Sequence, residues 1–392
     1  MSLTVQPGFR RLLSLAFNQD NSCVAIGTKD GFKIFNCDNC RCYYQRSEGA
    51  INVVEMLFST SLVAVVGAGQ QPALSPRRLS VFNMTTDALQ AELNFVSSIL
   101  CVRMNRKRLV VVLERKTYIH ELGQLAILHA IDTVSNTRGL CALSPNHENC
   151  YLALPASTTN GSVYVYDALD LHVLCQIQAH RSPLAAMSFS SDGLLLATAS
   201  DQGTVIRVHS IPQASKEYTF RRGSYPATIY SLSFGPPSQV PQLLAASCAS
   251  GTIHVFKLGN FARSRNEDLT SSVGQTSNGM AAGLLASVIP NSMSDMVESE
   301  RCFLTIKNGS PPNIRSHCAI AAHLEDADED GEEGPTSVSS SNRARIFVVT
   351  AGGFFHEWSI TVGQGRESTC TLQREVALLS SSSSDEISAH FV

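Results

Sequence analysis

The sequence predicts an all-β protein, a seven-bladed β-propeller built from divergent WD40-type repeats. Two observations carry this prediction: a recurring order of strands and turns, and a repeat period in the forties. The order is clearest where an apolar run is followed by an Asp-Gly turn, a second strand, another turn and a third strand (Leu184–Phe189, Leu194–Ser200 and Val205–Ser210). The same order occupies Leu12–Asn36. Asp-Gly pairs favour the tight hairpins that such a repeat needs.

The period is measured between equivalent strand positions. Leu143, Phe189 and Phe234 are spaced by 46 and 45 residues. Several short strands in a unit of that length are typical of propeller blades, and residues 8–376 hold about seven of them. Radial stacking explains the architecture, because a lone four-stranded blade cannot bury both of its faces. The usual Trp-Asp dipeptide is absent, since the only tryptophan, Trp358, is followed by serine.

Composition limits the function classes. The 392 residues carry a formal net charge of −3, so no overall basic field points to nucleic acid as a partner. The charge is uneven: seven acids and no base lie within residues 325–333, and the remainder has 30 bases against 26 acids. We expect residues 325–341, which are acidic and serine-rich, to form a mobile loop, and residues 377–392 to form a flexible tail.

The sequence shows no signal-peptide core at its N-terminus and no apolar window of membrane-spanning length, so we expect any membrane contact to be peripheral. The twelve cysteines have no framework spacing, which favours reduced thiols and the cytosol. Cys37, Cys40 and Cys42 lack a second cluster that would complete four zinc ligands, and we predict no metal and no cofactor. No nucleophile, phosphate-loop or paired-histidine motif is present, so we predict that the protein is not an enzyme.

A long insertion interrupts the repeats at residues 259–300, between the strand Thr252–Leu258 and the next expected strand, Arg301–Ile306. Insertions of this length in compact domains are usually functional or disordered. A second unusual stretch is the basic run Arg103–Lys116, which alternates with strand residues. We expect its charges to point outward, toward an acidic protein partner or solvent.

The most informative stretch is Phe220–Gly223, which contains the adjacent arginines Arg221 and Arg222 between two repeats. Successive side chains on an extended backbone point to opposite sides, so the pair can serve two separate pockets. The guanidinium group is a permanently charged fork of donors that suits phosphate. We expect Gly223 to leave the backbone free to turn beside them. An isolated Arg-Arg pair would more simply be a solvated basic turn.

The sequence on either side of the pair indicates more than a solvated turn. Together with the segments Gln178–Ala186, Ala197–Val208 and Ser247–Leu258, the Phe-Arg-Arg-Gly motif closely resembles the PROPPIN (or WIPI) family of seven-bladed propellers that bind phosphoinositides. Two further segments resemble that family's third and fourth blades (Val102–Glu114 and Gly139–Leu143).

The resemblance implies two headgroup sites on the propeller rim, one on each side of the arginine pair. The first would use Arg221 with five further residues, His180, Thr198, Ser200, Thr204 and Arg207. The second would use Arg222 with Ser247, Thr252 and His254. Cys248 is a departure, because family members often carry serine there and a thiol is a weak donor. Each of these side chains could also be an ordinary strand or turn residue.

The resemblance also implies that the insertion in blade six dips into the bilayer. An apolar stripe suited to a helix lying in the interface is formed by Met280, Leu284, Leu285, Val288 and Ile289. Gly283 weakens such a helix and Pro290 ends it. The alternative is a disordered loop with incidental apolar residues.

The implied function is a phosphoinositide effector, expected to be monomeric. It would bind phosphatidylinositol 3-phosphate and phosphatidylinositol 3,5-bisphosphate, and recruit autophagy machinery to phagophore assembly sites and to endosomal and vacuolar membranes. The implied partners are a lipid-transfer tether, engaged near Pro76-Arg77-Arg78, or a protein of the conjugation machinery. The alternative is a WD-repeat protein-interaction scaffold without a lipid ligand.

Overall fold

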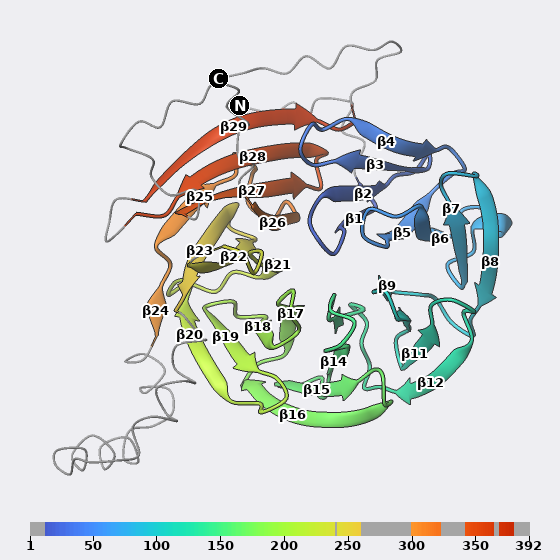
Figure 1. Ribbon diagram of the computed structural model, residues 1–392, viewed down its shortest axis with the longest axis horizontal. Coiled ribbons are helices and arrows are strands. Elements are labelled where there is room, and N and C mark those ends of the chain that lie inside the picture. Colours follow the sequence, from blue (N-terminus) through green and yellow to red (C-terminus); the bar gives the residue numbers. More distant parts are fainter. Residues whose placement is uncertain (1–11, 240, 260–298, 323–341, 364–367, 380–392) are drawn as a thin grey trace, which may run out of the picture.

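Seven antiparallel sheets surround a central axis in the computed structural model, which describes residues 12–239, 241–259, 299–322, 342–363 and 368–379 (Figure 1). Apart from one short 3-10 turn, η1 (Pro72–Leu74), the regular elements within these ranges are all strands. The predicted all-β, seven-bladed propeller is therefore confirmed.

In each blade, the strands are ordered from the axis outward as they occur along the chain. Blade one contains β1 (Ser14–Phe17), β2 (Cys23–Gly27), β3 (Phe32–Asn36) and β4 (Cys42–Arg46), and blade two contains β5 (Ile51–Met56), β6 (Leu62–Gly67), β7 (Arg78–Asn83) and β8 (Ala88–Asn94). Blade three contains β9 (Cys101–Met104), β10 (Arg108–Val112), β11 (Lys116–Glu121) and β12 (Ile127–Asp132), and blade four contains β13 (Ala142–Leu143), β14 (Tyr151–Pro155), β15 (Gly161–Asp167) and β16 (His172–His180). Blade five contains β17 (Leu184–Phe189), β18 (Leu195–Ser200), β19 (Val205–Ser210) and β20 (Lys216–Arg221), with β24 (Glu300–Arg301) added from later in the chain. Blade six contains β21 (Ile229–Phe234), β22 (Gln242–Cys248), β23 (Thr252–Leu258) and β25 (Leu304–Lys307), and blade seven contains β26 (Ser316–Ala322), β27 (Arg343–Thr350), β28 (Phe354–Thr361) and β29 (Thr369–Ala377).

The order of the strands fixes their directions. Each blade starts with its innermost strand and adds three antiparallel strands outward, so the chain returns to the same end before the next blade begins. All seven innermost strands therefore run the same way along the axis. The repeat positions chosen from the sequence agree with this arrangement, because Leu143, Phe189 and Phe234 each end an innermost strand.

Hydrophobic cores lie between neighbouring blades rather than inside any one of them. Between blades five and six, Phe220 stacks on Phe256 with 4.8 Å between ring centroids, and both are fully buried. Alternate residues of a strand serve the two faces: Leu244 and Ala246 pack toward blade five, whereas Leu243 and Ala245 pack toward blade seven. Burial of each phenylalanine or leucine side chain contributes about 1.5–3 kcal/mol to the stability of the fold.

The strand expected after the insertion is divided between two blades. The sequence suggested one strand over Arg301–Ile306, but β24 lies parallel to β20 of blade five, whereas β25 pairs with β23 and completes blade six. Blade five thus has five strands, and Figure 1 shows β24 outside β20. The division arises because the outer edge of β20 still offers unpaired backbone groups, which a returning chain can use.

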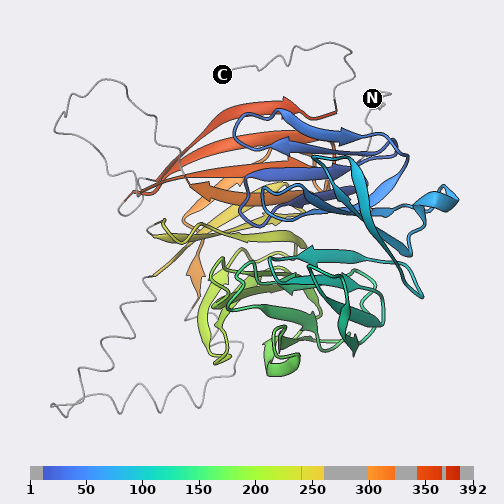
Figure 2. The same ribbon diagram turned by 45° about the vertical axis from the view of Figure 1, so that its right-hand side comes forward.

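The ring closes between blades seven and one without a shared strand, because both sheets are built from consecutive strands (Figure 2). A hydrophobic cluster spans this interface and includes Val24 and Phe355. A charged network lies beside it, formed by Arg345 with Asp38 (2.9 Å) and Glu357 (3.4 Å), and by Arg374 with the Cys37 carbonyl (3.0 Å). Closure of the ring therefore depends on side-chain contacts rather than on backbone pairing of a shared strand.

Several predicted segments lie outside the described residues. They are the acidic stretch 325–341, the tail beyond residue 379, and the apolar stripe of Met280, Leu284, Leu285, Val288 and Ile289. Within the part of the chain that the structure describes, no helix is long and apolar enough to cross a membrane.

Candidate anion-binding rim

Arg221 and Arg222 lie on opposite faces of blade five. Phe220 points into the core shared with blade six, so Arg221, the last residue of β20, faces blade four. Arg222 then faces blade six, where its Nε donates to the carbonyl oxygen of Gly203 at 2.7 Å and its Nη2 donates to that of Tyr225. The two guanidinium groups therefore serve different grooves, one between blades four and five and one between blades five and six.

In the first groove, three predicted residues form a directed hydrogen-bond chain. Arg207 donates from Nη1 to Nδ1 of His180 at 3.0 Å and to the Ala179 carbonyl at 2.7 Å. Nε2 of His180 lies 3.0 Å from Oγ1 of Thr198, whose hydroxyl donates to the Arg207 carbonyl at 3.3 Å. His180 comes from the outer strand of blade four, and the other two come from blade five. The chain therefore bridges the two blades and holds these side chains in fixed orientations.

The remaining members of the first group sit at the same end of blade five. Ser200 ends β18 on the face that Thr198 shares, and it is buried. Thr204 is half-buried, and its carbonyl accepts a hydrogen bond from the backbone N–H of Arg222 at 2.9 Å. Arg221 Nη2 lies 3.5 Å from the Ser224 hydroxyl.

In the second groove, Thr252 and His254 lie together on the face of β23 that looks toward blade five. Thr252 Oγ1 is 3.1 Å from His254 Nε2, and the other ring nitrogen is 3.3 Å from the Thr305 hydroxyl. Burial, and then the positive charge of Arg222, lower the pKa of His254 to about 4. The ring is therefore neutral at pH 7, and the effect of Arg222 shows that the two groups are close.

Ser247 is not brought to the second groove. It is fully buried, its hydroxyl donates to the Ser316 carbonyl of blade seven at 2.7 Å, and it pairs in register with Ile253, which faces the same way. The neighbouring Cys248 points toward blade five instead, where the charge of Arg222 partly offsets the rise in thiol pKa that burial causes. The structure thus gives the groove a thiol where the sequence-based prediction had a hydroxyl.

Two glycines near the pair play different roles. Gly203 has a φ of +58°, and a Cβ there would collide with the Ala227 carbonyl oxygen, so the turn that holds Arg222 needs glycine. Gly223 has no positive φ, and a Cβ there would meet no atom within 4 Å. The expectation that Gly223 supplies the turn is therefore wrong, because the requirement falls on Gly203.

Sequence reasoning missed Arg301. This residue is exposed and lies in parallel register beside Arg221, through the pairing of β24 with β20. Paired residues of neighbouring strands project to the same side, so Arg301 adds a second cation near Arg221. No local signal could have shown this, because the two residues are far apart in sequence.

The three cysteines that were considered as metal ligands lie in different environments. Cys37 and Cys40 are buried in the cluster between blades seven and one, and burial raises the pKa of Cys40 to about 11. Cys42 is exposed on β4. Across the described ranges, no three His, Cys, Asp or Glu side chains gather in a group that could hold a metal ion.

The chain is similar to known proteins over most of its length. The PROPPIN family profile matches residues 11–323. Autophagy-related protein 18b of Arabidopsis thaliana is 48% identical over 368 residues, covering 93% of this chain and 95% of that protein. Autophagy-related protein 18 of Dictyostelium discoideum is 44% identical over 318 residues, covering 79% and 83%.

Two solved structures share the fold. Kluyveromyces lactis Hsv2 with its complete loop 6CD superposes with a TM-score of 0.70 at 17% identity, covering 94% of this chain and 99% of that one. A complex of KlAtg21 with the coiled coil of AgAtg16 gives a TM-score of 0.68 at 25% identity, with the same coverage.

Proposed function

Because the chain belongs to the PROPPIN family of phosphoinositide-binding β-propellers, we propose that it is a non-enzymatic effector of phosphatidylinositol 3-phosphate and phosphatidylinositol 3,5-bisphosphate. Each of the two rim grooves would hold one lipid headgroup. The relatives named above are autophagy-related proteins, so the corresponding role is recruitment of autophagy machinery to membranes that carry these lipids.

The observation that carries the proposal is the division of Arg221 and Arg222 between two grooves, each of which also contains a histidine and a threonine. A guanidinium group binds phosphate oxygens in a bidentate manner, and hydroxyl and imidazole N–H groups supply further donors. The first groove has Arg207 already held in place by blade four. The Arg207 guanidinium group is therefore oriented before a headgroup arrives, which lowers the entropic cost of binding.

Both grooves lie on one side of the ring, at blades four to six, so binding would set the propeller edge-on to the bilayer (Figure 1). The insertion between β23 and β24 leaves the fold at this same side. We propose that Met280, Leu284, Leu285, Val288 and Ile289 enter the interface there. Two headgroups and one shallow insertion would then bind together with an effective concentration that no single contact reaches.

The protein partner would be a component of the autophagy conjugation machinery or a lipid-transfer tether, with the tether engaged near Pro76-Arg77-Arg78. The relative KlAtg21 has been solved in complex with a coiled coil of AgAtg16, which supports a helical partner for this fold. The protein itself would act as a monomer that is recruited from the cytoplasm to phagophore assembly sites and to endosomal and vacuolar membranes.

The test is co-sedimentation with liposomes that contain phosphatidylinositol 3-phosphate or, as a control, phosphatidylserine. Wild type is expected to pellet only with the phosphoinositide, and an Arg221→Thr, Arg222→Thr variant is expected to remain in the supernatant. An Arg41→Thr, Arg115→Thr variant is the matched control, because it loses the same charge from exposed positions on blades one and three. Equal pelleting of all three proteins, or none from folded wild type, would favour the scaffold without a lipid ligand.

A further inference from the structure

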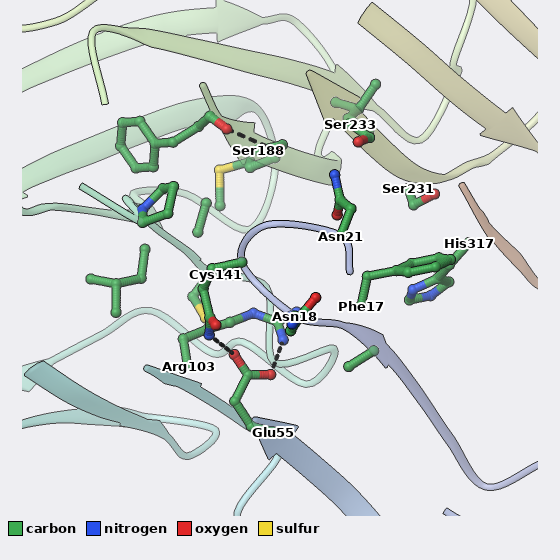
Figure 3. A pocket seen from close by; sticks show the side chains of 18 of the residues that line it. Phe17, Asn18, Asn21, Glu55, Arg103, Cys141, Ser188, Ser231, Ser233 and His317 are labelled. Carbon is green, nitrogen blue, oxygen red and sulfur yellow. Dashed lines mark hydrogen bonds and ion pairs between the residues drawn. The ribbon is translucent and has the colours of Figure 1, made fainter. Parts of the chain in front are cut away.

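A channel runs along the propeller axis, separate from both rim grooves. It has a volume of about 1130 Å³ and is lined by residues of all seven innermost strands. Figure 3 shows its wall, where Glu55, Arg103 and Cys141 come close together from three blades and His317 lies apart from them. This volume is slightly larger than the roughly 300–1,000 Å³ that is usual for small-ligand pockets in proteins.

The charged residues that line the channel are mostly basic. They are the arginines Arg103, Arg106, Arg138 and Arg315 and the acids Asp20 and Glu55. Glu55 is committed to Arg103, with 2.8 Å between Oε2 and Nη1, and it is buried. Asp20 accepts hydrogen bonds from the Ser22 hydroxyl and backbone, at the end of the channel where the innermost strands finish. Within the part of the chain that the structure describes, no ion pair joins Arg138 or Arg315 to a carboxylate, and Arg138 donates instead to the Leu184 carbonyl at 3.5 Å.

Two of these arginines, Arg138 and Arg315, lie at the mouth at which the innermost strands begin. Arg315 directly precedes β26 and Arg138 precedes β13 by a few residues, whereas Arg103, the third of the four residues of β9, lies deeper in the channel beside Glu55. Since all seven innermost strands run the same way, Arg138 and Arg315 lie at the same mouth. Arg106 lies beyond the end of β9, toward the opposite mouth, with its guanidinium 4.8 Å above the ring of Phe58.

The arginines at the basic mouth act on one another electrostatically. Burial, followed by the charges of Arg138 and Arg103, lowers the pKa of Arg315. Burial and the charges of Arg315 and Arg103 lower the pKa of His317 to about 3, so this ring adds no charge but offers a neutral donor or acceptor. Like charges held this close repel, and a bound anion would relieve that repulsion.

We propose that the basic mouth of the axial channel, formed by Arg138 and Arg315 with Arg103 deeper in the channel, binds a compact soluble polyanion that carries two or more phosphate groups. Arg138 precedes the first strand of blade four and Arg315 that of blade seven, and Tyr230 and His317 also line the channel. The ligand class is an inositol polyphosphate, a nucleotide triphosphate or an inorganic polyphosphate. This site goes beyond the proposed lipid function and uses none of its residues.

A soluble ligand fits this position better than a lipid headgroup. The channel opens along the axis, whereas the rim grooves lie on the circumference at blades four to six. A headgroup attached to a bilayer could reach the mouth only if the flat face of the ring lay on the membrane. Binding of lipid at the rim and binding of lipid at the mouth would require different orientations of the propeller on the membrane. Because the two sites use different residues, variants can distinguish them.

The experiment is isothermal titration calorimetry of the full chain with inositol hexakisphosphate, and in separate arms with ATP and pyrophosphate. The protein carries Arg221→Thr and Arg222→Thr, so that the rim grooves do not contribute. One ligand per chain is expected with inositol hexakisphosphate. Adding Arg138→Gln and Arg315→Gln should weaken binding by at least about tenfold, as expected when charged hydrogen-bond donors are lost. Adding Arg106→Gln instead should leave affinity unchanged, because this arginine lies at the opposite mouth.

Thermal unfolding provides the second measurement. Since Arg315 is repelled by its neighbours, the Arg138→Gln, Arg315→Gln variant should melt no lower than its parent, and inositol hexakisphosphate should raise the parent's Tm but not the variant's. The proposal is overturned if the parent binds none of the three anions, or if the glutamine variant binds them equally. It is also overturned if Arg138→Gln with Arg315→Gln, in the wild-type background, abolishes pelleting with phosphatidylinositol 3-phosphate liposomes, since the mouth would then serve the lipid.

Discussion

Arg207 donates a hydrogen bond to Nδ1 of His180 across the boundary between blades four and five, at 3.0 Å. A guanidinium group has no acceptor, so Nδ1 must carry a lone pair and the ring proton lies on Nε2. Nε2 then donates to Thr198, and the Thr198 hydroxyl donates to the Arg207 carbonyl. The first groove is therefore a closed circuit of donors that holds a neutral imidazole in one tautomer.

That circuit makes Thr198 a sensitive position. Thr198→Val removes one donor and one acceptor at a fully buried site, so we expect the free energy of unfolding to fall by about 1–3 kcal/mol. With Arg222→Thr present, so that only the first groove binds, the same change should weaken affinity for soluble short-chain phosphatidylinositol 3-phosphate. With Arg221→Thr present instead, affinity should be unaffected. Equal weakening in both backgrounds would show that the circuit is not specific to the first groove.

The placement of the two arginines on opposite faces predicts independent binding. Calorimetry with the soluble short-chain lipid should give two bound headgroups for wild type and one for either Arg221→Thr or Arg222→Thr. The double variant should bind none. If one single variant lost both headgroups, the arginines would have to share one pocket, contrary to the alternation along β20.

The second groove should respond to pH through His254, whose pKa is about 4 in the free protein. A phosphate bound nearby would raise that pKa, so binding takes up a proton wherever the pH lies between the free and bound values. Affinity in the Arg221→Thr background should therefore increase as the pH falls from 7 to 5, relative to the same protein with His254→Gln. The comparison cancels titration of the lipid phosphate itself. Identical pH profiles for the two proteins would remove His254 from the site.

Gly203 and Gly223 form a matched pair for testing the backbone. Gly203→Ala places a Cβ against the Ala227 carbonyl oxygen in a left-handed conformation, so it should displace the carbonyl that accepts Arg222 Nε. We expect a loss of the second headgroup and a lower Tm. Gly223→Ala has open space around it and should leave both unchanged. The opposite ranking would restore Gly223 as the turn residue.

Ring closure between blades seven and one predicts an effect on stability. Arg345→Ala leaves Glu357, which is largely buried, without one of its two arginine partners and should lower the free energy of unfolding by about 3 kcal/mol in urea titrations. Lys116→Ala is the control, because its pair with Asp132 is exposed and should contribute less than about 1 kcal/mol. Similar losses for both variants would mean that the charged network does not help to close the ring.

Much of this arrangement is encoded locally. The repeat of strands and Asp-Gly turns predicts the propeller, and the two-residue alternation of an extended strand predicts that Arg221 and Arg222 separate. His180, Thr198, Arg207, Thr252 and His254 all lie in the grooves for which they were predicted.

The expectations that were wrong concern positions that are set by contacts between strands and between blades. Ser247 pairs with Ile253 and so faces blade seven, a register that turn geometry sets and residue type does not reveal. Arg103 was expected to point outward, but β9 is an innermost strand, so this side chain lines the channel and pairs with Glu55. Arg301 reaches Arg221 only through a parallel pairing between segments distant in sequence.

The pairing of β24 with β20 has a further consequence. The Tyr218 hydroxyl of β20 donates to the Gly259 carbonyl at 3.1 Å, and Glu300 pairs with Phe220, two residues further along the same strand. Both ends of the insertion are thus clamped to one strand of the neighbouring blade. The propeller does not depend on the insertion's length to hold these ends in place. The insertion could therefore be replaced by another sequence, in evolution or by design. Such a replacement would change how the protein contacts a membrane and leave the geometry of the arginine grooves unchanged.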